Sequence, residues 1–90
     1  MFLARIDGTL TSTVKHETLN GARLLIAHRL DGEGQFIGEP TIVIDELGAP
    51  RGAVVLVSTD GDIIRKKRGN TTPARNTVVG IVDRVAGVPV

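Results

Sequence analysis

The feature that most constrains this chain is an apolar run that directly follows a glycine-flanked turn. The turn is Gly-Ala-Pro-Arg-Gly at residues 48–52, and residues 53–57 then contain no polar side chain. In a small antiparallel domain one face of a strand normally covers the core while the other meets water, so a strand with no polar face needs a second cover. A chain of 90 residues has little material to spare for this. A second copy of the chain is the simplest source of the missing cover for this strand. The sequence therefore predicts self-assembly.

A second apolar run, at residues 78–82, raises the same question later in the chain. Copies of one chain can associate by contacts in which one patch of a subunit meets a different patch on the next subunit. We expect the mostly apolar tail at residues 84–90 to reach across such a boundary. The side chains predicted to form the subunit interface are Val54, Val55, Leu56, Val57, Val78, Val79 and Ile81.

Charge and aromatic content argue against a nucleic-acid partner. The chain has 11 basic and 10 acidic side chains, a net charge of +1, so no overall field attracts a polyanion. Its aromatic residues are Phe2 and Phe36, which are few for a protein that stacks bases. The basic run at residues 65–68 is isolated and is typical of a solvated helix end. We therefore expect no nucleic acid among the partners.

The sequence shows no pattern of a catalytic, metal or cofactor site. His16 and His28 lack ligand spacing, cysteine is absent, and neither serine lies in a nucleophile-elbow pattern. No apolar run approaches the roughly 20 residues of a membrane helix, and no signal peptide is visible. The lack of cysteine fits a reducing compartment. We expect a single-domain cytoplasmic protein that is not an enzyme, needs no metal or cofactor and has no membrane partner.

Apolar and alternating segments predict five strands, separated by turn signals. The expected strands are residues 2–14, 22–30, 41–46, 53–57 and 76–83. The first is long for a small domain, and Gly8 is its natural bending point. One face of this strand is expected to carry Phe2, Ala4, Ile6, Leu10 and Val14.

The remaining signals concern the connections. Residues 31–34, Asp-Gly-Glu-Gly, can close a tight hairpin. Thr59 as N-cap with Asp62 three residues later predicts a short helix at residues 60–67. Because closure removes exposed edges in so small a domain, the fold class predicted is mainly β: a small five-stranded OB-like β-barrel with one short helix.

Five short segments, in order along the chain, form a specific pattern. They are Ala-Arg-Ile-x-Gly-Thr-x-x-Ser-Thr-x-Lys at residues 4–15, Leu-x-Gly-x-x-Leu-Leu at 19–25, Gly-Glu-Pro at 38–40, Asp-x-x-Gly-Ala-x-x-Gly-x-x-Val-Leu-Val-Ser at 45–58 and Val-Val-Gly-Ile-Val-Asp at 78–83. Their order and spacing across the chain are more specific than any one of them. In this pattern the chain resembles the pentameric vertex proteins of bacterial microcompartment shells, the EutN/CcmL family.

The resemblance implies a β-barrel protomer that forms a homopentamer and caps the vertices of a polyhedral shell, in a carboxysome or a metabolosome. It implies hexameric and trimeric shell proteins as partners, no cofactor, and a narrow opening on the five-fold axis. Hydroxyl side chains suit a wet constriction, and the glycine-flanked turn is an equal candidate for it. The residues predicted to border the opening are therefore Thr11, Ser12 and Thr13, or the turn from Gly48 to Gly52.

The central turn departs from the motif Gly-Ala-Gly-x-Gly-Glu that is common in this family. Pro50 stands at the third position, where φ near −65° excludes a left-handed conformation, and Ala53 replaces the glutamate.

Charges at the rim of a ring, in the basic run 65–68 or the acidic loop 31–33, are expected to guide contacts with shell proteins. The alternative function, from another class, is a monomeric OB-type binding module for nucleic acid or a small ligand.

Overall fold

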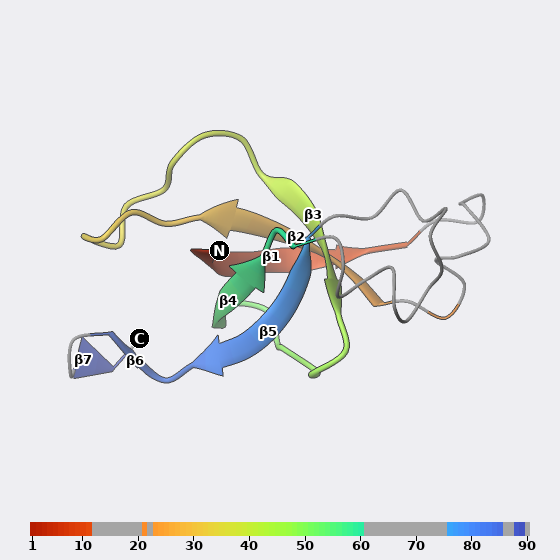
Figure 1. Ribbon diagram of the computed structural model, residues 1–90. Helices are drawn as coiled ribbons and strands as arrows, with labels where there is room; N and C mark the ends of the chain where they lie inside the picture. Colours follow the sequence, from red (N-terminus) through yellow and green to blue (C-terminus); the bar gives the residue numbers. More distant parts are fainter. Residues whose placement is uncertain (12–20, 22, 61–75, 86–87, 90) are drawn as a thin grey trace.

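The computed structural model describes residues 1–11, 21, 23–60, 76–85 and 88–89 (Figure 1). Its strands are β1 (Phe2–Leu10), β2 (Arg23–Arg29), β3 (Thr41–Asp45), β4 (Val54–Ser58), β5 (Thr77–Val82), β6 (Arg84–Val85) and β7 (Val88–Pro89). The first five form a closed barrel in the order β1-β2-β3-β5-β4, and β6 and β7 form a separate two-stranded sheet. The prediction of a mainly β fold built on a five-stranded barrel is confirmed.

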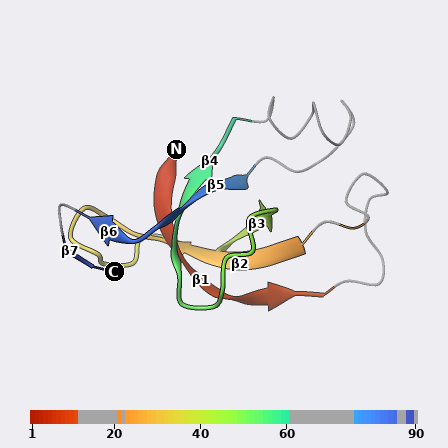
Figure 2. The ribbon, with the colours of Figure 1, turned by 90° about the horizontal axis from the view of Figure 1, so that it is seen from below.

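The joins between strands differ greatly in length. β1 pairs antiparallel with both β2 and β4, β2 pairs antiparallel with β3, and β4 pairs antiparallel with β5. The last join, between β3 and β5, is a single parallel pair, Ile44 with Thr77. Here Thr77 Oγ1 donates to the Ile44 carbonyl at 3.3 Å, and the Ile44 N–H donates to the Asn76 carbonyl at 3.0 Å. Beyond this seam β5 runs on toward β6 and away from β3 (Figures 1 and 2).

The core fills the inside of the barrel with small and medium apolar side chains. Each core residue is at most 4% exposed, and every strand of the barrel contributes at least one. Burying a valine or leucine side chain stabilises a fold by about 1.5–3 kcal/mol, so this cluster is the main source of protomer stability. The core consists of Ala4, Ile6, Leu25, Ala27, Val43, Ala49, Val55, Val57 and Val78, with Phe2 and Ala53 packed against it.

β1 contains a bulge that changes which of its residues face inward. Its register with β2 shifts between Ile6 and Gly8, where the sequence predicted a bend. Ile6 pairs with Ala27 but Leu10 pairs with Leu24, and residues three apart on β2 lie on opposite faces. The prediction that Leu10 shares a face with Ile6 is therefore wrong, because the extra residue of a bulge reverses the alternation.

The predicted bounds of β2, β3, β4 and β5 agree with the observed ones to within one residue at each end. β1 ends at Leu10, and residues 12–14 of the predicted strand lie outside the described residues. The predicted helix also lies outside them, except for Asp60, which is not helical and whose N–H donates to Ser58 Oγ at 3.1 Å. The pairing of β6 with β7 in the C-terminal tail was not predicted.

Candidate subunit-contact surfaces

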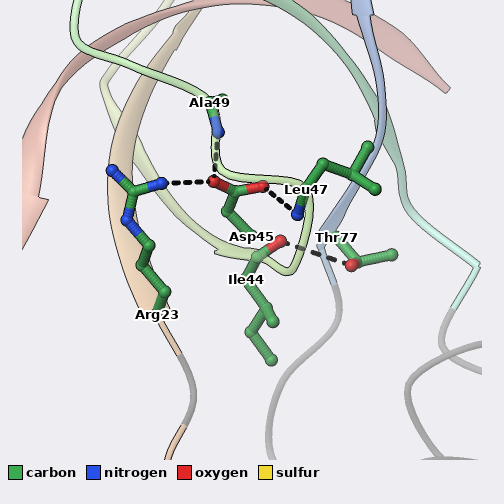
Figure 3. A network of polar contacts seen from close by, with 6 residues as sticks. All are labelled: Arg23, Ile44, Asp45, Leu47, Ala49 and Thr77. Carbon is green, nitrogen blue, oxygen red and sulfur yellow. Dashed lines mark hydrogen bonds and ion pairs between the residues drawn. The ribbon is translucent and has the colours of Figure 1, made fainter.

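A buried carboxylate fixes the turn that follows β3 (Figure 3). The Asp45 side chain accepts hydrogen bonds from the backbone N–H groups of Leu47 at 2.9 Å and of Ala49 at 2.7 Å. Arg23, on the neighbouring strand β2, adds an ion pair with 2.9 Å between Nη1 and Oδ2. A buried charge is tolerated when it is paired and hydrogen-bonded, and Asp45, 2% exposed, meets this condition. The arrangement is structural: it ties residues 46–49 to the barrel.

Two glycines let the same turn return to the barrel as β4. Gly48 and Gly52 have φ angles of 82° and 85°, in the left-handed region that favours glycine. Arg5 Nη1 donates to the Gly52 carbonyl at 2.9 Å, which anchors the end of the turn on β1. The left-handed residues are at positions 48 and 52, so Pro50 occupies a position that does not require a positive φ.

The two groups of residues predicted to border an axial opening lie at different places on the barrel. Gly48 and Gly52 are exposed on the turn between β3 and β4, and the Gly52 N–H donates to the Ile6 carbonyl at 2.8 Å. Thr11 is exposed just after β1, about 16 Å farther along the chain from Ile6 at ~3.3 Å per strand residue. Ser12 and Thr13 lie outside the described residues. Since one chain does not define the five-fold axis, both groups remain predictions.

The apolar runs of β4 and β5 divide into side chains that the barrel itself covers and side chains that it leaves outside. Leu56 is half-buried, whereas Val79 and Ile81 are 38% and 42% exposed. Among the predicted interface residues, these three are the ones that the barrel does not fully bury, and Leu56 is the one such residue of β4. Their contact with another subunit remains a prediction. The other predicted interface residues are at most 4% exposed and pack within the protomer: Val54, Val55, Val57 and Val78.

Outward-facing side chains of β1, β4 and β5 form a continuous row. Leu3 pairs with Leu56 and Leu56 pairs with Gly80, so the three positions share the outer face. Val79, exposed, lies beside Gly80 where the register of β5 with β4 shifts. We call this surface the β4–β5 patch and define it as Leu3, Leu56, Val79, Gly80 and Val82.

A second apolar surface lies over β2 and β3, and the sequence analysis did not single it out. Ile42 pairs with Ile26 and is 53% exposed. His28, two residues after Ile26, lies on the same face. The Phe36 ring stacks on the His28 ring with 4.4 Å between centroids, and Phe36 is 55% exposed. We call this surface the β2–β3 patch and define it as Ile26, His28, Phe36, Ile37 and Ile42.

The loop that carries Phe36 is held down on β2 by its own hydrogen bonds. The Asp31 carboxylate accepts from the N–H groups of Glu33 at 2.8 Å and Gln35 at 3.0 Å, which confirms the tight turn predicted at residues 31–34. His28 Nε2 donates to the Gly38 carbonyl at 2.8 Å. The available sequence signal was the run Ile-Val-Ile at residues 42–44, which is apolar on both faces like residues 53–57.

The described residues contain neither a metal-ligand cluster nor a membrane-spanning helix. No three His, Asp or Glu side chains there come together as a metal site requires. No helix in the same ranges is long and apolar enough to cross a membrane.

Sequence comparison extends the pattern of segments to almost the whole chain. A family model described as ethanolamine utilisation protein EutN/carboxysome matches residues 1–83. The chain belongs to the EutN/CcmL family. The resemblance found in the sequence is thereby confirmed.

Relatives and solved structures of the EutN/CcmL family give the same result. The microcompartment shell vertex protein GrpN from Rhodospirillum rubrum is 38% identical over 89 residues, 98% of this chain and 99% of the relative. The carboxysome shell vertex protein CcmL from Synechocystis sp. is 41% identical over 86 residues, 94% of this chain and 85% of the relative. The solved structure of GrpN, described as a pentameric microcompartment shell protein, aligns with a TM-score of 0.82 and 36% identity over 94% of this chain and 96% of GrpN.

These EutN/CcmL family relatives are named as structural shell proteins and not as enzymes. The two patches of this chain therefore lie on the fold of a family whose named relatives are shell vertex proteins.

Proposed function

We propose that this chain forms a homopentamer that caps the vertices of a polyhedral bacterial microcompartment shell, in a carboxysome or a metabolosome of the cytoplasm. The observation that carries the proposal is the alignment, over nearly the full length of both chains, with the pentameric shell protein GrpN. The half-buried Leu56 and the exposed Val79 and Ile81 are apolar and supply surface for a subunit boundary. The role is structural and uses no cofactor.

Mass measurement tests the ring directly. Native mass spectrometry of the unmodified chain is expected to show a species near five times 9.5 kDa, about 47 kDa, because a closed five-fold ring has a fixed number of subunits. The measurement is made at tens of micromolar protein, with circular dichroism to confirm the fold. A well-folded monomer under these conditions would reject the vertex role and favour the monomeric binding module instead.

The partners of the ring are proposed to be hexameric and trimeric shell proteins. The basic run Arg65, Lys66, Lys67 and Arg68 and the acidic loop 31–33 are the candidate contacts. Because charges at the edge of an interface act mainly on encounter and are screened by salt, reversing all four basic charges is expected to weaken co-assembly with cognate shell proteins most clearly at low salt. Co-sedimentation with those proteins measures this, with reversal of Asp31 and Glu33 as the matched comparison. Unchanged co-assembly at low salt would remove the basic run from consideration.

A further inference from the structure

The described part of the chain presents two separate apolar surfaces, as a heterologous ring contact requires. The β2–β3 patch and the β4–β5 patch lie on different flanks of the barrel. In the closed order β1-β2-β3-β5-β4, the pairing of β1 with β2 separates them on one side and the seam of β3 with β5 on the other. Each subunit of a ring can therefore offer one patch to each of its two neighbours.

The two patches have opposite relief. Gly80, in the β4–β5 patch, continues the row of Leu3 and Leu56 but has no side chain, so the row has a gap next to Val79. A Cβ placed there would meet one described atom within 4 Å, Leu56 Cβ at 3.8 Å, so the position is open on its outer side. In the β2–β3 patch the Phe36 ring is 55% exposed and is backed by the nearly parallel His28 ring, 19° between planes. One patch therefore has room at a position without a side chain, and the other presents the exposed face of a supported aromatic ring.

Charges around the patches oppose contact between like patches. The loop that carries Phe36 in the β2–β3 patch also carries Asp31, Glu33 and Glu39, whereas Arg29 of β2 lies over the Phe2 ring and Arg5 of β1 pairs with His28 at the edge of the patch. Two copies of this patch facing each other would set acidic rims together, which costs free energy. Beside the β4–β5 patch, Arg5 pairs with Val54, which pairs with Val82, and Arg5 also contacts the turn that carries Arg51, so an acidic loop can find cations there.

We propose that the β2–β3 patch of one subunit docks on the β4–β5 patch of the next, with Phe36 seated over Gly80. The proposal rests on the homopentamer proposed above and specifies its boundary. Rigid aromatic side chains in the centre of an interface commonly carry much of the binding free energy, and Phe36 has this character. The assignment places loop 31–33 at the boundary between subunits and leaves the basic run 65–68 as the candidate contact with shell proteins.

Adding a side chain at position 80 tests pentamer formation separately from folding of the protomer. Gly80→Val is expected to preserve or raise the thermal midpoint of the dissociated chain, because position 80 has room for a Cβ and valine favours strands more than glycine does. It is expected to raise the concentration at which the pentamer dissociates by roughly ten-fold or more, as loss of a central contact does. Thr9→Ile adds apolar volume at an exposed position of β1 outside both patches and serves as the control, with no change in assembly expected.

A double-mutant cycle tests whether Phe36 and Gly80 meet. Phe36→Ala alone is expected to weaken the ring, and the combination with Gly80→Val to assemble better than Gly80→Val alone, because removing the ring makes room for the new side chain. Native mass spectrometry over a dilution series measures all four proteins. Purely additive effects, or an intact ring in Gly80→Val, would overturn the proposal.

Cross-linking gives a second, independent readout, since the chain has no cysteine of its own. Ile37→Cys combined with Val79→Cys, treated with a short bismaleimide, is expected to give a covalent ladder that ends at five chains. Each single variant alone is expected to give no ladder. If the unmodified chain is pentameric but the pair gives no ladder, the docking proposal fails and the pentamer stands. If the unmodified chain is monomeric, both fail.

Discussion

Val55→Asp is expected to prevent the protomer from folding, whereas Val79→Asp is expected to leave it folded and abolish the ring. Val55 is 0% exposed and pairs with Ala4 on one side and Ile81 on the other, so a carboxylate there would be buried without a partner. A change of this kind costs more than about 4 kcal/mol, a large share of the roughly 5–13 kcal/mol that stabilises a domain of this size.

Val79 is 38% exposed, so aspartate at this position stays hydrated in the free chain and costs about 1 kcal/mol or less. At a subunit boundary the same carboxylate would be buried against apolar side chains. Urea denaturation followed by circular dichroism measures the first effect, and native mass spectrometry the second. A folded Val55→Asp protein would contradict the described core, and an intact ring in Val79→Asp would exclude Val79 from the boundary.

Removal of the Asp45 carboxylate is expected to produce the second large effect. Asp45→Ala would leave the N–H of Ala49, a fully buried residue, without its acceptor and would leave Arg23 without its ion pair. An unsatisfied buried donor costs about 1–3 kcal/mol, so a total loss of roughly 2–4 kcal/mol in the free energy of unfolding is expected. Asp45→Asn should lose nearly as much, because its amide group places a donor opposite other donors.

Arg23→Ala is the matched control for Asp45. The Arg23 side chain is 42% exposed, so solvent screens its ion pair, and the two backbone donors still satisfy the carboxylate. We expect a loss of about 1 kcal/mol or less. Urea denaturation of Asp45→Ala, Asp45→Asn and Arg23→Ala ranks the three variants by their free energy of unfolding. An Asp45→Asn protein as stable as the unmodified chain would show that the turn does not depend on this carboxylate.

The sequence predicted the barrel because apolar runs and turn residues recur at strand spacing, and burial inside a barrel is what such runs require. The sequence could not show which apolar side chains the barrel buries and which it leaves exposed. Val55 and Val79 look alike in the sequence, yet the barrel buries one and leaves the other outside. The bulge after Ile6 is likewise invisible to a strict alternation, which is why Leu10 was placed on the wrong face.

The β2–β3 patch was missed for a different physical reason. Its most exposed residue, Phe36, belongs to a loop and reaches β2 through a local turn and a ring stack with His28. Periodicity describes strands and helices, and it carries no information on where a loop folds back. The interface prediction accordingly named residues of β4 and β5, and the structure shows a second exposed apolar surface on β2 and β3.

The single-pair seam between β3 and β5 also determines when this barrel can form. Its closing residues, Ile44 and Thr77, lie 33 positions apart, and β5 is the last barrel strand to leave the ribosome. Until then β4 has no partner on one edge, and its apolar run is exposed to other nascent chains. Pairing of such distant segments is slow compared with local structure. The barrel is thus completed only after synthesis of β5.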